Sequence, residues 1–190
     1  MHLLEKRILS DGKIFPGNIL KVDSFLNHQI DPILLQEMGI ELANHFHKYA
    51  INKVLTIETS GIALALTTAL ALNVPMVFAK KEKGLNSSNN VFKTNVFSYT
   101  KKKETTITVD KCFLNAQDKI LIIDDFLANG QALSGLISLC KQAQATVIGA
   151  GIGIEKVFQG GGNKLRLEGY HIYSLAKISH FQENKILFEE

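Results

Sequence analysis

The stretch that decides the fold is Leu121-Ile-Ile-Asp124-Asp125-Phe126-Leu127-Ala128-Asn129-Gly130-Gln131-Ala132-Leu133. The stretch begins within a continuous apolar run, Ile120 to Ile123. The length and β-branching of this run predict a buried central strand. Apolar residues recur at helical spacing after Gln131, so we expect a helix to begin there. In open α/β sheets, ligands bind beyond the carboxyl ends of the strands. The stretch therefore predicts a ligand site between the strand and the helix.

The loop between the predicted strand and helix favours an anion. Free N–H groups at a helix N-terminus attract phosphate, and Gly130 allows close approach of the backbone. Asp124 and Asp125 are suited to hydroxyls, or to a divalent cation bound with the ligand. A phosphate site beside such carboxylates matches a ribose 5-phosphate. The alternative, a strand-ending turn with solvated aspartates, is disfavoured by the strand, glycine and helix in register.

A second stretch repeats this arrangement. Lys53 to Glu58 reads as a buried strand, followed by the loop Thr59-Ser60-Gly61 and a helix from about Ile62. Hydroxyls, backbone N–H groups and a glycine at a helix start make a second anion site. An ordinary βα turn explains the loop equally well when it is taken alone. We expect an α/β fold with a mostly parallel sheet and helices on both faces.

Length and composition limit the classes of protein. The 190 residues suffice for one domain with a sizeable core, and the net charge of +3 does not demand nucleic acid. Cys112 and Cys140 lack CxxC spacing, which favours reduced thiols in a cytoplasmic protein. The apolar stretch from Ile62 to Ala79 is divided by Pro75, so a buried helix and strand are expected rather than a membrane span.

The N-terminal part predicts a short helix over 3–9 that ends at Gly12, a strand over 19–22, and a helix that begins at Asp31-Pro32. The segment between the strand and the second helix is polar and irregular, so it suits a pocket wall. The Asn27 side chain donates and accepts at once, which suits the amide-like edge of a purine. From the residues alone, a turn role for Asn27 is the commoner reading.

The middle of the chain predicts a strand over 74–79, followed by Lys80 and Lys81, which by themselves read as a solvated surface. Polar residues with interleaved aromatics then extend from Glu82 to about Lys103. This pattern favours a mobile hairpin, with a returning strand over 105–109. A basic loop with aromatics can indicate nucleic acid, but a loop that closes over a ligand site and excludes water is the favoured interpretation.

The C-terminal part predicts a strand over 146–154 with Glu155-Lys156 at its end. Lys156 suits an oxygen of a ligand, although a surface lysine is the commoner reading from the residues alone. A glycine loop over 159–162 and a short helix are expected next. Residues 171–178 alternate like a strand with an exposed face, and 185–188 suit a terminal strand.

Together these segments resemble the type I purine phosphoribosyltransferases, and more narrowly their bacterial members that act on xanthine. The resemblance covers essentially the whole chain. The segments that carry it are Leu20 to Pro32, Glu58 to Ala63, Ser98 to Thr100, Leu121 to Leu133 and Ile154 to Lys156.

The resemblance implies transfer of a phosphoribosyl group from PRPP to xanthine, with Mg²⁺ held mainly by PRPP rather than by a metal site of the protein. It implies catalytic roles for Asp124, Asp125 and Tyr99. It implies PRPP binding by Ala128, Asn129, Gly130, Gln131, Ala132, Glu58, Thr59, Ser60, Gly61 and either Lys80 or Lys81. It implies base binding by Leu20, Asn27 and Lys156, the last at the 6-oxo group.

The resemblance also implies a hood over the base, formed by about 1–30 and 156–190, a lid over about 82–106, and a homodimer with shared sites. The sequence departs from the hypoxanthine–guanine branch at Ala128, where that branch carries an aspartate. Asn129 and Ala132 replace threonines, so the backbone is expected to dominate phosphate binding. The alternatives are a guanine or hypoxanthine enzyme, a PRPP-sensing transcription regulator, and an inactive interaction protein.

Overall fold

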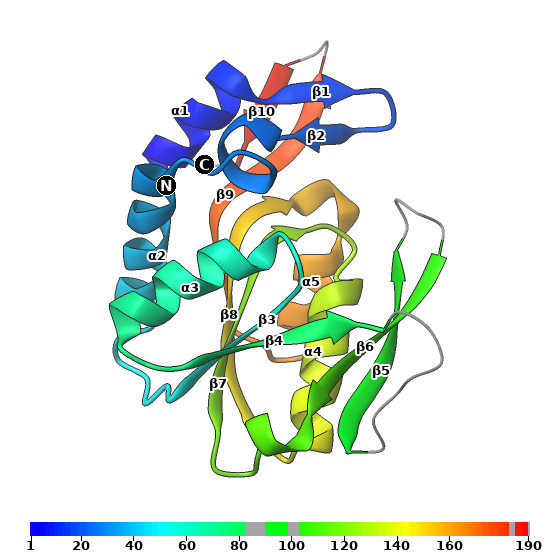
Figure 1. Cartoon of the computed structure of the whole chain (residues 1–190). Coiled ribbons are helices and arrows are strands. Elements are labelled where there is room, and N and C mark those ends of the chain that lie inside the picture. Colours follow the sequence, from blue (N-terminus) through cyan, green and yellow to red (C-terminus); the bar gives the residue numbers. More distant parts are fainter. Residues whose placement is uncertain (83–89, 99–102, 183–184, 190) are drawn as a thin grey trace.

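The computed structural model describes residues 1–82, 90–98, 103–182 and 185–189. Within these ranges the main sheet has eight strands in the order β10-β9-β8-β7-β3-β4-β6-β5, and β1 and β2 form a separate two-stranded sheet (Figure 1). The strands are β1 (Lys13–Phe15), β2 (Ile19–Lys21), β3 (Lys53–Ile57), β4 (Met76–Lys81), β5 (Val91–Ser98), β6 (Lys103–Asp110), β7 (Lys119–Leu127), β8 (Thr146–Lys156), β9 (Ile172–Gln182) and β10 (Lys185–Phe188).

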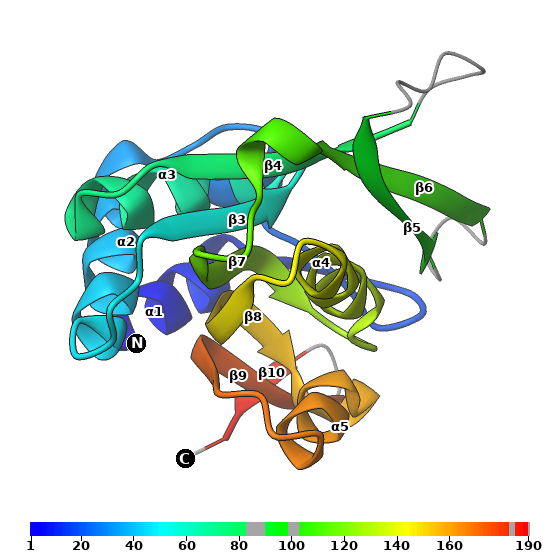
Figure 2. The same cartoon turned by 90° about the horizontal axis from the view of Figure 1, so that it is seen from below.

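Five described helices pack on this sheet, with short helical turns at Asp23–Asn27, Lys111–Phe113 and Val157–Gln159. The helices are α1 (His2–Asp11), α2 (Pro32–Phe46), α3 (Gly61–Leu72), α4 (Gln131–Gln142) and α5 (Gly161–Leu167). Helices α1, α2 and α3 cover one face, and α4 and α5 cover the other (Figure 2). The neighbouring strands β9, β8, β7, β3 and β4 are parallel, and the outer pairs are antiparallel. The predicted fold class is confirmed.

The central strand β7 is longer than its apolar run predicted. We expected the strand to end at Ile123, but its pairing with β8 continues through Asp124, Phe126 and Leu127. The backbone pairing therefore extends beyond the apolar residues, and the acidic pair lies inside the strand.

Side chains of β7 alternate between two cores. Leu121 and Ile123 pack into the core under α2 and α3, whereas Ile120 and Ile122 pack into the core under α4. Because both faces are covered, all four are buried completely, as the continuous apolar run predicted.

Two predicted helix boundaries have clear local causes. The Asp31 side chain accepts from the N–H groups of Ile33 and Leu34, at 3.2 and 3.1 Å, so the predicted N-cap of α2 is confirmed. Helix α1 ends before Gly12, as expected, but Gly12 is extended with φ −69° rather than left-handed. A Cβ at Gly12 would lie 2.4 Å from the Ile8 carbonyl oxygen, so the glycine is needed for space.

The prediction for residues 171–178 was partly wrong. They form a strand, but most of this part of β9 is buried rather than exposed on one face. The cause is that β9 lies inside the sheet: its first half pairs with β8 and its second half with β10. Strand β10 lies at one end of the molecule with α1, β1 and β2 (Figure 1).

The hairpin of β5 and β6 extends the opposite edge of the sheet. The two strands pair along their whole described length, and β6 joins β4 at Lys80 and Lys81. Parts of the predicted lid, residues 83–89 and 99–102, lie outside the described residues. No helix in the described part of the chain is long and apolar enough to cross a membrane.

Candidate active site

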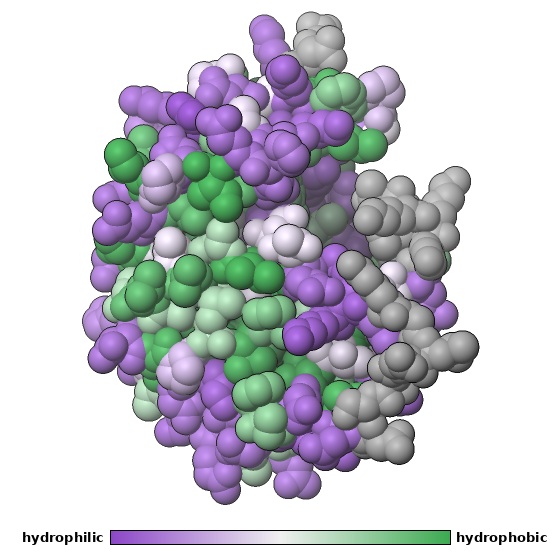
Figure 3. Space-filling view, viewed as in Figure 1, coloured by the Kyte–Doolittle hydropathy of each residue, from purple (hydrophilic) through white to green (hydrophobic). Residues whose placement is uncertain are grey.

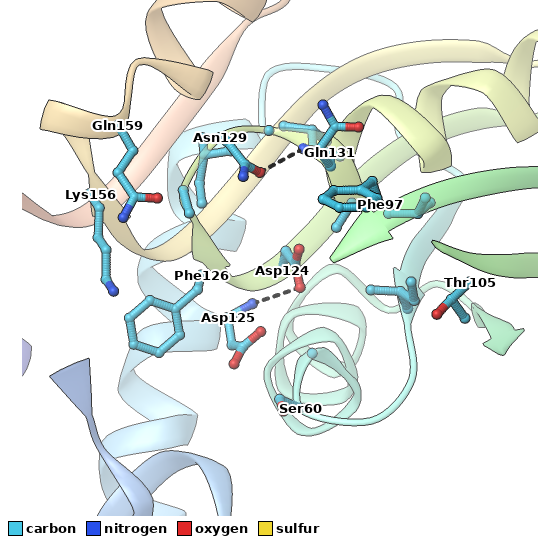
Figure 4. A pocket seen from close by; sticks show the side chains of 18 of the residues that line it. Ser60, Phe97, Thr105, Asp124, Asp125, Phe126, Asn129, Gln131, Lys156 and Gln159 are labelled. Atoms are coloured by element: carbon cyan, nitrogen blue, oxygen red, sulfur yellow. Dashed lines mark hydrogen bonds between the residues drawn. The ribbon is translucent and has the colours of Figure 1, made fainter. Parts of the chain in front are cut away.

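A cavity of about 550 Å³ opens at the carboxyl ends of β3 and β7 (Figure 4). Its walls are the loop after β3, the end of β7 with the loop after it, the β1–β2 turn, and the hairpin of β5 and β6. Both predicted anion loops therefore meet in one cavity, as parallel strands with adjacent carboxyl ends require.

The loop after β7, residues 128–130, is called the central loop below. Gly130 adopts φ +81° and leads directly into α4, a conformation that favours glycine. The cavity is lined by Ala128 and Asn129, and by Gln131 and Ala132 of the first turn of α4. The Asn129 side-chain oxygen lies 3.4 Å from the Gln131 backbone nitrogen. The first N–H groups of a helix have no partner within it, so this wall suits an anion.

The acidic pair of β7 lines the same cavity. Asp124 is buried, and its Oδ1 accepts from the Asp125 N–H at 3.1 Å. Burial, and then the neighbouring charge of Asp125, hold the pKa of Asp124 well above its usual value, although the charge of Lys81 acts in the opposite direction. Burial also raises the pKa of Asp125. The ligand-free site thus holds two carboxyl groups whose charge is poorly compensated.

The loop after β3 lines the wall beside the acidic pair. Glu58, Thr59, Ser60 and Gly61 all contact the cavity, and the peptide bond between Glu58 and Thr59 is cis. A Cβ on Gly61 would lie 3.2 Å from Asp124 Oδ1, so the start of α3 packs closely on the acidic strand.

The two lysines after Ala79 have different positions. Lys81 lines the cavity, whereas Lys80 does not. The Lys81 N–H donates to Glu58 Oε1 at 2.6 Å, which ties β4 to the second anion loop. The sequence left the choice between the two lysines open, and strand alternation explains why only one faces this cavity.

Of the three residues predicted to bind a base, only Lys156 lines the cavity. Its Nζ donates to the Asn18 carbonyl oxygen at 3.0 Å, and lies 5.7 Å from the centre of the Phe126 ring. Burial lowers the pKa of Lys156. Lys156 thus joins the end of β8 to the β1–β2 turn across the mouth of the site.

Leu20 and Asn27 do not line the cavity. Leu20 is part of the core under α1 and α2. The Asn27 side chain hydrogen-bonds Asp125, which lowers the pKa of that carboxyl against the effect of burial. The Oδ1 atom of Asn27 is buried and accepts no hydrogen bond from the described residues.

Several lining residues were not predicted. They include Phe126, Phe97, Thr105, Gln159, the β1–β2 turn residues Gly17 and Asn18, and Ile19 at the start of β2. Phe126 directly follows the acidic pair. It was missed because we expected the strand to end before the pair, whereas β7 continues through Phe126. The turn becomes part of the wall only through tertiary packing. Tyr99 lies outside the described residues.

The described residues contain no group of three or more His, Cys, Asp or Glu side chains arranged to hold a metal ion. Asp124 and Asp125 offer two neighbouring carboxyl groups in the cavity, and both have raised pKa values. A divalent cation would relieve this electrostatic cost, but only if a ligand or water completes its shell.

Residues 23–184 match the family model of the phosphoribosyl transferase domain. The chain therefore belongs to the phosphoribosyl transferase family. The match includes both anion loops and the acidic pair.

Similar proteins within the family include two that are named xanthine phosphoribosyltransferase. The one from Finegoldia magna is 51% identical over 190 residues, and covers all of both chains. The one from Listeria monocytogenes serotype 4b is 53% identical over 190 residues, which is all of this chain and 99% of its own.

Solved structures show the same fold. The APRTase of Giardia lamblia, complexed with 9-deazaadenine, has a TM-score of 0.77 at 25% identity, and the match covers 93% of this chain and 98% of that one. The adenine phosphoribosyltransferase of Rhodothermus marinus has a TM-score of 0.76 at 21% identity, over 94% and 100% of the two chains.

Proposed function

We propose that this chain transfers the phosphoribosyl group of PRPP to xanthine, which yields the nucleotide XMP and pyrophosphate in purine salvage. The observation that carries this proposal is the buried acidic pair of β7 between two anion loops in one cavity. The relatives that share about half of its residues, over the full chain length, support xanthine as the base.

PRPP is a ribose with a phosphate at one end and a pyrophosphate at the other. The central loop and the first turn of α4 bind the 5-phosphate through backbone N–H groups. Asp124 and Asp125 accept hydrogen bonds from the ribose hydroxyls. The loop 58–61 and Lys81 bind the pyrophosphate, whose charge Lys81 partly neutralises.

Mg²⁺ is the expected cofactor, and it fits this site because the acidic pair is buried with little positive charge nearby. Asp124 and Asp125 would hold it through the ribose oxygens and water, while PRPP supplies most of its ligands. When bound, it neutralises charge on the leaving pyrophosphate.

The chemical step needs no attacking side chain. The bond from the ribose anomeric carbon to the pyrophosphate oxygen breaks, and a bond from that carbon to a purine nitrogen forms. The protein holds both reactants in line and excludes water while the ribose carries positive charge. Ala128 cannot take the proton from the base, so xanthine loses it to water or binds already ionised.

The base is expected between the β1–β2 turn and the end of β8. Lys156 donates to its 6-oxo group, and Phe126 offers an aromatic face for stacking. Asn27 does not line the ligand-free cavity, so its role at the base requires the segment after β2 to move until the buried, unpartnered Oδ1 can accept from an N–H of the base. Leu20 is buried and does not line the cavity, so its proposed role is to support the β1–β2 turn from beneath rather than to contact the base.

The remaining proposals concern the molecule around this site. Residues 1–30 and 156–190 form a hood over the base, residues 82–106 form a lid that includes Tyr99, and the active protein is a cytoplasmic homodimer. The hood proposal is supported by the β1–β2 turn in the cavity wall, and the lid proposal by Phe97 and Thr105 in the opposite wall.

The alternative is the same reaction with guanine or hypoxanthine, because Lys156 reads a 6-oxo group that all three bases carry. The test is a PRPP- and Mg²⁺-dependent assay with xanthine, guanine, hypoxanthine and adenine side by side. Preference for xanthine supports the proposal. Preference for another base retains the reaction and removes the assignment of Asn27. No nucleotide from any base, with PRPP still bound, would contradict the transferase and favour a PRPP-sensing regulator.

A further inference from the structure

The short helix α5 packs against the central loop without lining the cavity. The Gly161 N–H donates to the Ala128 carbonyl oxygen at 3.1 Å. A Cβ on Gly161 would lie 2.3 Å from the Asn129 carbonyl carbon and 2.4 Å from the Gly130 nitrogen. These are backbone atoms on both sides, so no side chain can rotate to make room. The start of α5 and the central loop therefore fix each other's position.

A second contact supports the same loop from further along α5. The buried side chain of Leu165 lies against Gly130, where a Cβ would be 3.2 Å from Leu165 Cδ1. Gly130 is the residue whose left-handed backbone turns β7 into α4. Helix α5 thus packs on the point that sets the direction of the α4 amides.

Helix α5 is itself anchored by an ion pair. The Arg166 guanidinium donates from Nη1 to Glu155 Oε1 and from Nη2 to Glu155 Oε2, both at 2.7 Å. The Ser174 hydroxyl donates to the same carboxylate at 2.5 Å. A two-point contact of this kind fixes orientation as well as distance. Glu155 is completely buried at the end of β8.

Glu155 is the charged partner that its neighbours keep ionised. Burial alone would raise the pKa of Glu155, but hydrogen bonds from Arg166 and Ser174 outweigh burial and lower it. Glu155 stays ionised across the neutral range, so the anchor is permanent under assay conditions. Glu155 also precedes Lys156, so the residue next to the base-binding lysine holds the helix that supports the central loop.

We infer that α5 is a positioning element for the phosphate end of PRPP: Gly161 and the Glu155–Arg166 pair hold the central loop in the shape that binds ribose 5-phosphate. This inference rests on the proposed function. None of these three residues touches the substrate, and their effect passes through the loop backbone. No side chain from Ala128 to Ala132 carries a hydroxyl group, so the backbone shape of the loop has to supply most of the binding.

The first test is Gly161→Ala. The added Cβ displaces the central loop, and we expect the KM for PRPP to rise about tenfold or more, the size of about one lost hydrogen bond. The KM for xanthine should stay within about twofold. The Kd for ribose 5-phosphate, measured by calorimetry without any turnover, should rise by the same factor as the KM for PRPP.

The matched control is Gly169→Ala, beyond the other end of α5. Gly169 has φ +93° with nothing within 4 Å of a new Cβ, so alanine strains the backbone without touching the loop. We expect a lower Tm and unchanged substrate constants. Arg166→Lys is a second probe that retains the charge but loses the two-point contact, and should raise the Kd for ribose 5-phosphate in a folded protein.

The outcomes separate this inference from the proposed function. Wild-type protein that does not bind ribose 5-phosphate contradicts both. A second outcome is that the wild type binds ribose 5-phosphate, and that both Gly161→Ala and Arg166→Lys bind it equally well but have a lower Tm. This outcome contradicts only the positioning role. A rise in the Kd for ribose 5-phosphate with an unchanged KM for xanthine supports it.

Discussion

The acidic pair of β7 places a functional demand and a stability cost on the same two residues. Ionised carboxylates are needed for the ribose hydroxyls, yet burial and mutual repulsion oppose that ionisation in the ligand-free protein. Sites that are built for a ligand commonly cost stability in its absence.

Replacing Asp124 and Asp125 with asparagine should therefore have opposite effects on activity and stability. We expect kcat/KM to fall by at least about 100-fold, because contacts to the reacting ribose are lost. The Tm of the ligand-free protein should rise, because a buried charged pair becomes neutral. Steady-state kinetics and calorimetry on the same preparation measure both effects.

Asp118→Asn is the control for this prediction. Asp118 is also buried, but Lys53 Nζ donates to it at 2.7 Å and the Asn115 N–H at 2.9 Å. Its substitution should lower the Tm and leave kcat unchanged. Near-normal turnover in the Asp124/Asp125 variant would remove the ribose assignment.

The same pair predicts a pH dependence. Since the native pKa values are raised, the native protein takes up protons more readily than the unfolded chain does. Stability of the ligand-free protein should thus increase as the pH falls through the raised values, and the gain levels off near the ordinary value of 3.8.

PRPP binding should have the opposite pH dependence, with its KM rising over the same window as the pair is protonated. Urea unfolding at a series of pH values, in wild type and in the double asparagine variant, measures the difference in unfolding free energy. Identical pH dependences in the two proteins would show that the pair does not titrate in this way.

Asn129 tests how the central loop binds phosphate. Its side chain makes only a long contact to the Gln131 nitrogen, so the loop depends little on this amide. Asn129→Thr should retain activity within about threefold. A total loss of turnover, with the fold intact by circular dichroism, would contradict binding led by the backbone.

How well the sequence predicted single residues depended on how local their environment is. The central loop and the loop 58–61 were predicted correctly as cavity walls, because strand, glycine and helix follow one another in the chain. Lys156 was found through the family resemblance. Asn18 was missed, because its role depends on a β1–β2 turn that meets β8 from 138 residues away in the sequence.

At the scale of elements, strand alternation separates two adjacent lysines of β4. Lys81→Met should raise the KM for PRPP about tenfold or more, since a charge beside the pyrophosphate is lost. Lys80→Met should have little effect on a cavity that it does not line. Parallel kinetics on the pair decide the assignment. The reverse result would assign pyrophosphate binding to Lys80.

Element types were predicted from hydrophobic period, but their ends and their burial were not. Apolar residues alone placed the end of β7 at Ile123, whereas pairing with β8 carries it to Leu127. Residues of β9 alternate in polarity, yet most of its first half is buried because β8 and β10 flank it. Neighbouring strands, which a linear pattern does not contain, set both properties.

At the scale of the whole molecule, α3 carries exposed apolar side chains, and we predict that a second copy of the chain packs on them in the proposed homodimer. Leu66 and Leu70 lie one turn apart on α3 and are exposed, and Figure 3 shows apolar surface over this helix. Leu70→Glu should shift a homodimer toward monomer in sedimentation velocity. Phe113→Glu, at an exposed aromatic outside α3, is the control. A monomeric wild type would contradict the proposed homodimer.

The two edges of the sheet differ in how firmly they hold the walls of the cavity. Strand β9 is continuous: its first half pairs in parallel with β8, and its second half pairs antiparallel with β10. On the other edge, the β5–β6 hairpin pairs with β4 at only two positions, Lys80 with Thr108 and Lys81 with Ile107, and it also packs on α4, where the Gln142 side chain hydrogen-bonds the backbone of Lys93. The hairpin wall of the cavity therefore has fewer backbone pairs to the rest of the sheet than the wall at the end of β8 has. Substrate entry and product exit should therefore occur by bending on the hairpin side, while the wall at the end of β8 keeps its shape through each cycle.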